Sequence, residues 1–345
     1  MIKKSRIVKL SDDMHHCSSI CHDSKGHYLT FYYGKECTDD QRVALLYYPN
    51  HGDDYFGNKH YYVLEQKTGN PIVFNYKGEI FLIYSKFTDC EEDGTPIDYG
   101  RNIVQRWKNC DNFVARVVVD DKNIILKDIN KIDKCYGRLA RCQPVEFNGE
   151  MLIPMYREAD PISEVWSFDG KNVILKSQFG FIDDDVEDVI SKNNLQYNYL
   201  GSGVAIQPTL IEEKGNLLAF CRNVCRSNNQ QNRNAWFSKS VDGLNWSRIE
   251  YTGIPNHNNS LVAIPFSGRI CFVLNVNASR DNMILYDSKS RKSVHLNVSL
   301  LRSRNSFSYP NYDWNGNILN IVHTNCGRIM WHQIDEEFLY EAFGE

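Results

Sequence analysis

One short pattern of polar and hydrophobic positions recurs along the chain. Each copy has a basic, small or polar residue, then Gly, then one more polar position, and continues into an apolar run rich in strand-forming residues. The copies begin at six positions, separated by 52, 71, 66, 53 and 48 residues: Lys25 (KGHYLTFYYG), Lys77 (KGEIFLIYSK), Asn148 (NGEMLIPMYR), Lys214 (KGNLLAFCRN), Ser267 (SGRICFVLNV) and Asn315 (NGNILNIVHT). Because glycine adopts the backbone angles of a tight turn at little cost, each copy predicts a turn followed by a buried strand.

The period of this pattern indicates the architecture. One strand–turn–strand unit cannot bury both of its faces, and units of about 50 residues match the blades of a β-propeller. A β-sandwich would also contain many short strands, but it would not repeat six times at this period. We therefore predict an all-β fold, a single six-bladed β-propeller over residues 1–335.

The last ten residues depart from the strand pattern. Apolar side chains lie at positions i, i+1, i+4 and i+5, namely Phe338, Leu339, Ala342 and Phe343. This spacing places them on one face of a short amphipathic helix. We expect residues 336–345 to form a helical tail that packs on the propeller.

Two segments predict turns of another kind. Residues 240–246 (SVDGLNW) have the spacing of an Asp-box hairpin, in which the Asp accepts hydrogen bonds from turn amides and the Trp packs beneath. Residues 167–170 (SFDG) look like a second copy without the Trp. Such hairpins hold a fold together and rarely take part in chemistry, so we assign them a structural role.

Composition disfavours several classes of function. Lys and Arg number 39 and Asp and Glu 43, a net charge of −4, so there is no basic excess for a nucleic acid. Apolar runs such as residues 80–84 are far shorter than the ~20 residues that span a membrane. The first residues lack the apolar core of a signal peptide, and the eleven cysteines are scattered. We expect a cytoplasmic protein with reduced thiols, no metal site and no cofactor.

Each recurrent strand begins after its glycine turn and is followed, at its other end, by polar side chains. Four of them are cations in a chain of negative net charge: Lys35, Lys86, Arg157 and Arg222. Asn275 and His323 occupy the corresponding positions of the last two copies. Propeller ligands bind where strand ends and loops meet around the axis, so these cations predict an anionic ligand.

Six short motifs follow one another with blade-matched spacing. They are residues 16–20 (HCSSI), 69–74 (GNPIVF), 141–149 (RCQPVEFNG), 207–209 (QPT, followed by Arg222), 254–260 (IPNHNNS) and 307–310 (FSYP). Together they resemble the motifs of the sialidase superfamily, specifically its branch of BNR-repeat-like proteins with Asp-box hairpins. The resemblance runs from about His15 to Asp335 and implies a propeller of sialidase type.

The resemblance also implies a set of active-site residues. Sialidases are retaining exo-glycosidases that hold the sugar carboxylate with three arginines, protonate the leaving oxygen with an Asp, and attack with a Tyr activated by a Glu. Arg222 and Arg280 match the second and third arginines, and His16 takes the place of the first. Gln207 stands at the Glu position. Phe307 stands at the Tyr position, with Tyr309 two residues further on the same strand face.

These differences bear on the chemistry. Gln207 cannot take a proton from a phenol, which argues against hydrolysis of sialosides by the usual Tyr–Glu pair. His16 could act as an acid or a base near neutral pH. The acid Asp of sialidases lies on the loop after the first recurrent strand, where Asp40 is our first choice and Asp39 our second.

Three functions stay open. The leading hypothesis is an exo-glycosidase acting on an anionic glycan terminus (a sialic, ulosonic or uronic acid), with Asp40 or Asp39 as general acid and His16 or Tyr309 assisting. A polysaccharide lyase would use His16, Tyr309 and Lys35 on a uronate. A glycan-binding propeller without catalysis is the third, favoured by Phe307 and Gln207.

All three hypotheses imply the same kind of partner, an acidic glycan or glycoconjugate. The side chains expected to bind it are Arg222, Arg280, Lys35, Lys86, Arg141, Asn256, Asn275 and His323. We expect a monomer or a weak homo-oligomer.

Overall fold

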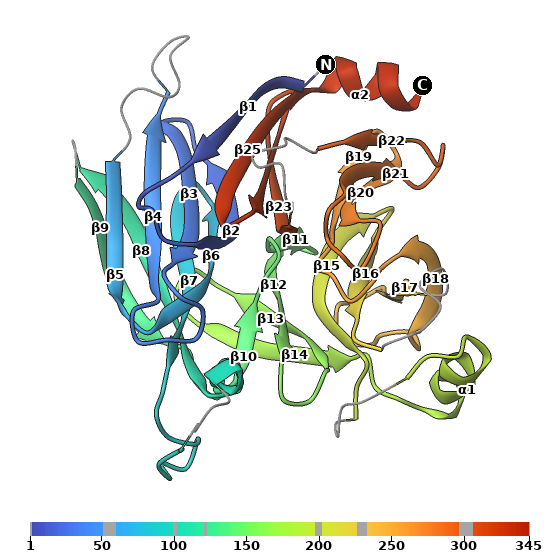
Figure 1. The fold of residues 1–345 in the computed structure, drawn as a ribbon, viewed down its shortest axis with the longest axis horizontal. Helices are drawn as coiled ribbons and strands as arrows, with labels where there is room; N and C mark the ends of the chain where they lie inside the picture. Colours follow the sequence, from blue (N-terminus) through green and yellow to red (C-terminus); the bar gives the residue numbers. More distant parts are fainter. Residues whose placement is uncertain are drawn as a thin grey trace.

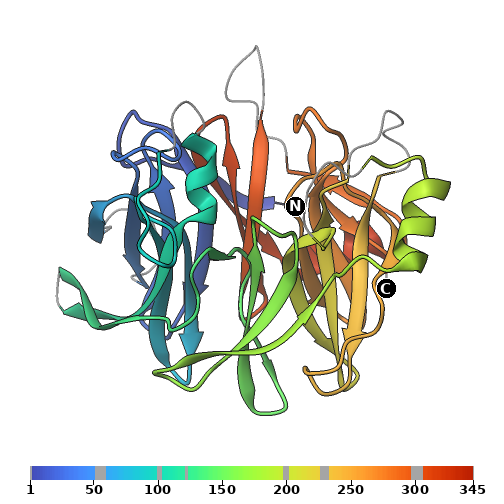
Figure 2. The same cartoon turned by 90° about the horizontal axis from the view of Figure 1, so that it is seen from below.

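The computed structural model describes residues 2–50, 60–98, 103–120, 123–196, 202–225, 233–296 and 306–344. Within them the chain forms six antiparallel sheets arranged as the blades of a β-propeller (Figure 1), as the period of the sequence pattern predicted. Seen edge-on in Figure 2, the strands run between two faces of the ring.

The sheets follow the order of the chain. Blade 1 contains β2 (His15–His22), β3 (Gly26–Tyr33), β4 (Arg42–Pro49) and β5 (His60–Gln66); blade 2 contains β6 (Thr68–Tyr76), β7 (Glu79–Phe87), β8 (Cys110–Asp120) and β9 (Asn123–Lys131). Blade 3 contains β10 (Arg138–Ala140), β11 (Val145–Phe147), β12 (Glu150–Arg157), β13 (Ser163–Phe168) and β14 (Val173–Phe179). Blade 4 contains β15 (Ala205–Glu213), β16 (Asn216–Asn223), β17 (Asn234–Ser240) and β18 (Glu250–Pro255). Blade 5 contains β19 (Val262–Phe266), β20 (Arg269–Asn275), β21 (Met283–Asp287) and β22 (Ser293–His295).

Blade 6 joins the two ends of the chain. It contains β23 (Phe307–Asn315), β24 (Ile318–Asn325) and β25 (Arg328–Asp335), and its outer strand is the N-terminal β1 (Ile2–Val8). The blue β1 lies alongside the red β25 in Figure 1, with Val8 opposite Ile329 and Ile2 opposite Ile334. Hydrogen bonds between the first and last strands therefore close the ring.

The recurrent strands of the sequence pattern are the second strands of the blades, β3, β7, β12, β16, β20 and β24. Four of the turns before them have two consecutive left-handed residues, as at Lys77 (φ 52°) and Gly78 (φ 83°). This geometry matches the twist of a hairpin and explains the recurrent glycine. The axis is lined by the first strands, which contact one another from blade to blade, so the recurrent strands lie one position further out in each blade.

A bulge interrupts four of the first strands near their N-terminal ends. The pairing register shifts there, and one residue in each bulge has a left-handed backbone: Cys17 (φ 57°), Asn70 (φ 43°), Gln207 (φ 51°) and Tyr309 (φ 51°). The next residue is Ser18, Pro71, Pro208 or Pro310. Proline fits because a bulge releases an N–H from the ladder. Such strained residues gather at functional sites, and these four bulges lie at equivalent places of their blades.

In the described part of the chain, three short helices lie outside the sheets. The 3₁₀ helix η1 (Ile103–Lys108) lies in the β7–β8 connection, and α1 (Asp184–Lys192) is capped by Asp183, whose carboxylate accepts a hydrogen bond from the Val186 amide at 3.0 Å. The C-terminal α2 (Glu336–Phe343) buries Leu339 and Phe343 in the core shared by blades 5 and 6. Within the described ranges, no helix has the length and apolar character needed to cross a membrane.

The Asp-box hairpin connects β17 to β18. Asp242 Oδ1 accepts hydrogen bonds from the amides of Leu244 and Asn245, both at 2.8 Å. Trp246 stacks on Phe179 of blade 3, with ring centroids 4.3 Å apart, and donates to Ser177 Oγ at 2.9 Å. The hairpin therefore ties blade 4 to blade 3, which agrees with its structural assignment. The turns at Asp169 and Asp287 repeat the carboxylate–amide contacts.

Most of the cysteine side chains lie in the interior of the blades. All eleven are free, and nine of them are buried. Burial raises the pKa of many of these thiols, for example Cys17 to about 12, so they remain protonated at neutral pH.

Candidate functional site

His16 and Tyr309 meet at the axis from the first strands of blades 1 and 6. Their rings are perpendicular, with centroids 4.6 Å apart, and the ring of Tyr32 on β3 lies 5.6 Å from His16. Burial, with the charges of Arg141 and Arg280, lowers the pKa of His16 to about 3. The imidazole is therefore neutral at neutral pH. A neutral imidazole can accept a proton but cannot donate one as an imidazolium, so the pKa favours the base over the acid among the two roles that we expected.

Tyr309, and not Phe307, is the β23 side chain that lies beside His16. Phe307 is fully buried in the core between blades 5 and 6, and its carbonyl accepts a hydrogen bond from Asn275 at 2.9 Å. We expected both side chains on one strand face, but the bulge between Ser308 and Asn311 breaks the alternation. Burial raises the pKa of the Tyr309 phenol, so it is protonated at neutral pH.

Arg141 braces the centre of the ring. It lies between β10 and β11 with 2% of its surface exposed, and its guanidinium carbon is 5.0 Å from the centroid of the Tyr309 ring. It donates hydrogen bonds to the carbonyls of Ser18 and Pro310, both at 3.3 Å. This arginine joins the first strands of blades 1, 3 and 6 and places a positive charge beside the tyrosine.

Arg222 and Arg280 are brought together by one loop. Arg222 Nε donates to Asn258 Oδ1 at 2.8 Å, and Arg280 Nε donates to Asn259 Oδ1 at 2.6 Å. Arg280 Nη2 also lies 3.4 Å from the carbonyl of Asn258. Both arginines alter the pKa of Tyr309, so they lie within electrostatic range of it. Two adjacent asparagines therefore hold both arginines, and both guanidinium groups act on Tyr309 electrostatically.

Gln207 lies in the same central cluster. It is buried, and its Nε2 donates to the hydroxyl of Tyr156 at 3.2 Å. Its Oε1 has no hydrogen-bond partner among the described residues. Of the twenty buried side-chain atoms without a partner there, His16 Nδ1, Tyr32 Oη and Arg141 Nε also belong to this cluster, and the others are spread over the blades. Buried polar atoms are nearly always paired with protein, water or ligand, so these four atoms are available to hydrogen-bond a polar ligand.

Two glutamates near this cluster were missed by the sequence analysis. Glu36 follows β3, and its Oε1 accepts a hydrogen bond from the indole of Trp107 at 3.1 Å. Glu158 directly follows β12; burial raises its pKa, Arg222 and Lys108 lower it, and Glu36 raises it further. No motif marks either residue, although both occupy the strand-end positions where we looked for cations.

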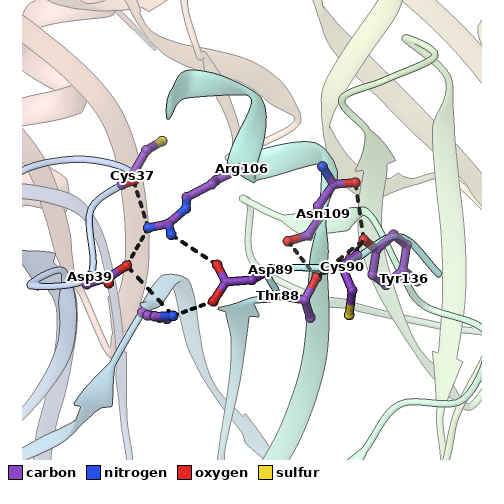
Figure 3. Close-up of polar contacts among 9 residues, drawn as sticks. Cys37, Asp39, Thr88, Asp89, Cys90, Arg106, Asn109 and Tyr136 are labelled. Atoms are coloured by element: carbon purple, nitrogen blue, oxygen red, sulfur yellow. Dashed lines mark hydrogen bonds and ion pairs between the residues drawn. The ribbon is translucent and has the colours of Figure 1, made fainter. Parts of the chain in front are cut away.

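The two aspartates expected as general acid lie at the rim. The side chain of Asp39 is 60% exposed and accepts a hydrogen bond from Arg106 of η1 at 2.7 Å. Arg106 also bonds Asp89, which Lys67 bonds from the other side, so Asp39 belongs to a surface ion-pair network between blades 1 and 2 (Figure 3). Asp40 is exposed. Neither aspartate is joined to His16 or Tyr309 by a contact within the described residues.

Five other residues expected to bind substrate have different surroundings. Lys35 is exposed, and Lys86 pairs with Glu65 at 2.7 Å on the surface. His323 is fully buried against His332, with 2.9 Å between their Nε2 atoms, and Asn275 bonds the carbonyl of Phe307. Asn256 is buried and braces the loop of the arginine pair by donating to the carbonyl of Asn259 at 2.8 Å.

The fold and this site define a propeller of the sialidase type. A model of the BNR repeat-like domain family matches residues 58–321, so the chain belongs to that family. Among solved structures it resembles *Trypanosoma rangeli* sialidase in complex with the inhibitor DANA, with 11% identity over 95% of this chain and 56% of the sialidase and a TM-score of 0.63.

A subtype N10 neuraminidase-like protein from a little yellow-shouldered bat isolate has a similar fold. Its TM-score is 0.52, with 8% identity over 97% of this chain and 99% of that protein. At these identities the likeness concerns the fold alone. The chain spans less than two thirds of the length of the trypanosomal sialidase. A search of curated protein sequences found no match.

Among the described residues, no group of three His, Cys, Asp or Glu side chains is arranged to hold a metal ion. The charged groups of the candidate site are arginines and glutamates, which suit a hydrogen-bonded organic ligand.

Proposed function

We propose that this protein is a sialidase-like exo-glycosidase that binds and hydrolyses the anionic terminal sugar of a glycan. The observation that carries the proposal is the arginine pair, with Arg222 and Arg280 both held by the Asn258–Asn259 segment beside Tyr309. Two fixed guanidinium groups can orient a sugar carboxylate through paired charge-assisted hydrogen bonds. The unpaired buried atoms of His16, Arg141 and Gln207 offer further contacts for sugar hydroxyls.

The site differs from a sialidase that relies on a tyrosine nucleophile. Tyr309 has a raised pKa, and Gln207 cannot take its proton, so the phenol is a weak nucleophile. We therefore expect slow or no turnover of simple sialosides, while sugar carboxylates still bind. The same observation favours a second candidate function, a glycan-binding propeller without catalysis. A lyase has less support, because Lys35 is exposed on its loop and His16 is a weak base.

The proposal is tested by binding and turnover with a panel of acidic sugars. Methyl glycosides of sialic, ulosonic and uronic acids are titrated by calorimetry, with the matching neutral sugars as controls, and their aryl glycosides are used for turnover. Arg222→Ala or Arg280→Ala should weaken binding by ~2–5 kcal/mol, about 30-fold to several thousand-fold, the usual cost of truncating a buried hydrogen-bonded charge. Lys86→Ala, which removes a surface cation, should change affinity less than twofold.

Two results would contradict this reading. Equal affinity for acidic and neutral sugars, or wild-type affinity in both arginine variants, would remove the carboxylate clamp. Binding that needs both arginines, without turnover of any aryl glycoside, would leave the glycan-binding function in place of the glycosidase. Rapid turnover of an aryl sialoside that is lost in Tyr309→Phe would restore the usual tyrosine mechanism.

A further inference from the structure

Asparagine side chains fix the loop that follows β18. Asn256 Oδ1 accepts a hydrogen bond from the amide of Asn223 at 3.1 Å, and Asn256 Nδ2 donates to the carbonyl of Asn259 at 2.8 Å. Asn259 Nδ2 donates to the carbonyl of Asn277 at 3.0 Å. The loop is therefore tied to the end of β16 in blade 4 and to the β20–β21 turn in blade 5.

Two asparagine oxygens of this loop each accept a hydrogen bond from an arginine. Arg222 Nε donates to Asn258 Oδ1 at 2.8 Å, and Arg280 Nε donates to Asn259 Oδ1 at 2.6 Å. Both arginine side chains are partly exposed. Among the described residues, no hydrogen bond involves Nη1 or Nη2 of Arg222 or Nη1 of Arg280. Because the loop contacts each guanidinium group at Nε, these terminal nitrogens can donate to the oxygens of a ligand.

The acceptors that hold this pair carry no charge, in contrast to the partners of other arginines. Arg106 bonds Asp39 at 2.7 Å, Arg116 bonds Glu79 at 3.0 Å, and Arg269 bonds Asp287 at 3.2 Å. Arg222 and Arg280 form no ion pair with any described residue. The positive charge of the pair is therefore held in place without a bonded carboxylate to offset it.

Arg280 also links the pair to Tyr309. The amide of Phe307 donates to the carbonyl of Arg280 at 2.7 Å, and Phe307 begins β23 two residues before Tyr309. A ligand carboxylate held by Arg280 would therefore have a fixed position relative to the strand that carries the tyrosine.

We propose that Asn258 and Asn259 are positioning residues of the carboxylate clamp formed by Arg222 and Arg280, and that they determine its preference for an anionic sugar. This inference rests on the proposed function and deepens it, and it applies to binding with or without hydrolysis. Each amide oxygen fixes one guanidinium group through Nε and leaves its charge for the ligand. The sugar carboxylate bonds the terminal nitrogens and supplies the negative charge that the loop does not provide.

Aspartate in place of Asn258 separates charge from geometry. The two side chains have nearly the same shape, and a carboxylate oxygen can accept the same hydrogen bond from Arg222 Nε. Aspartate also tolerates the left-handed backbone at this position (φ 58°), so the loop conformation is retained. Its negative charge pairs with the arginine and repels the carboxylate of the sugar. Affinity should therefore fall although the contact to the arginine is kept.

The test is calorimetric titration of the full chain with an acidic methyl glycoside that binds the wild type. Asn258→Asp should weaken affinity by about 10- to 100-fold, while the free energy of unfolding stays the same or rises. Asn258→Gly keeps the left-handed backbone and removes the side chain, so it should weaken affinity by only about 2- to 10-fold. A role in folding alone predicts the reverse order, because aspartate keeps the hydrogen bond that glycine loses.

Asn259 is tested by a second matched pair. Asn259→Asp and Asn259→Ala both lose the hydrogen bond to the carbonyl of Asn277, so the difference between them reports the added charge. The aspartate variant should bind the acidic glycoside about 3- to 10-fold more weakly than the alanine variant. Asn123→Asp adds the same charge to an exposed position on the outer strand of blade 2, and it should change affinity less than about twofold.

The outcomes distinguish this inference from the proposed function. If Asn258→Asp binds the acidic glycoside as tightly as the wild type, or more tightly than Asn258→Gly, the positioning role is wrong. Loss of binding in Arg222→Ala would still support the clamp in that case. If the wild type binds no acidic glycoside, the proposed function is wrong, and this inference with it.

Discussion

Strands β2 and β23 are neighbours at the axis and make two histidine contacts with opposite electrostatic results. At one end His16 touches Tyr309, with ring centroids 4.6 Å apart, and its pKa is lowered to about 3 by burial and two arginines. At the other end His22 Nδ1 lies 2.7 Å from Asp313 Oδ2, and this hydrogen bond raises the pKa of His22. The two histidines are six positions apart on one strand, so their surroundings and not the backbone decide the direction in which each pKa is shifted.

The two ends of the axis therefore suit different ligands. The His16 end has three arginines, whose guanidinium groups contact loop and strand carbonyls and amides in place of carboxylates. The His22 end opens into a cavity of about 440 Å³, whose lining includes Asp313, Asp23, Gln143 and Trp314 and no Lys or Arg. Among the described residues, the arginines of the first end supply the positive charge that suits a sugar carboxylate.

The largest expected effect is the loss of stability when Arg141, which lies at the His16 end of the axis, is removed. Arg141→Ala removes a buried side chain that bonds the Ser18 and Pro310 carbonyls, so the free energy of unfolding should fall by about 2–4 kcal/mol in urea denaturation. Arg141→Met keeps most of the packing and should lose less. The pKa of His16 should rise in both variants. Wild-type stability in Arg141→Ala would show that the brace is dispensable.

Acidification should change the stability contributions of His16 and His22 in opposite directions. We expect these changes to be smaller than the loss of stability in Arg141→Ala. His16 is neutral when folded and protonates more readily when unfolded, so its contribution to stability is lost as pH falls from about 6.5 toward 3. His22 has the opposite sign, and its contribution is complete below about 6.5 and is lost as pH rises through its raised pKa.

Unfolding curves and histidine NMR between pH 4 and 8 measure both contributions. Asp313→Asn should lower the pKa of His22 and cost about 0.5–1.5 kcal/mol near pH 6, a modest value because both side chains are partly exposed. Burial raises the pKa of Asp313 by more than His22 lowers it. Asp313 therefore protonates as the pH falls, and the destabilisation caused by Asp313→Asn should become smaller at lower pH. If the measured pKa of His22 were lower than that of His16, the electrostatic difference between the two ends would be the opposite of the one described here.

The smallest expected effect is the difference in ligand affinity between variants at the two ends of the axis. His16→Gln removes a side chain of the candidate site and should weaken binding of an acidic methyl glycoside by about 2- to 10-fold, the worth of one hydrogen bond. His22→Gln at the other end should change affinity less than twofold. Calorimetry on the two variants makes the measurement, and equal losses would show that the ligand does not distinguish the ends.

Much of the fold was already present in the sequence, because its signals are local. Each Gly turn and the strand after it lie within ten residues, and the repetition of that unit determines the blades and their number. The carboxylate–amide contacts of Asp242 are equally local. The arginine pair was also predicted, because motif order along the chain places Arg222 and Arg280 in successive blades.

The candidate site depended on contacts that no local pattern contains. The bulge at Tyr309 sends Phe307 into the core, and a rule of alternation cannot anticipate that shift. Glu36 and not Asp39 turns inward because Trp107 and Arg106, about 70 residues away in the chain, bond them differently. The charge of His16 depends on arginines from two other blades. Strand formation needs only neighbouring residues, whereas burial and charge at the axis are set by all six blades together, and only the tertiary structure decides them.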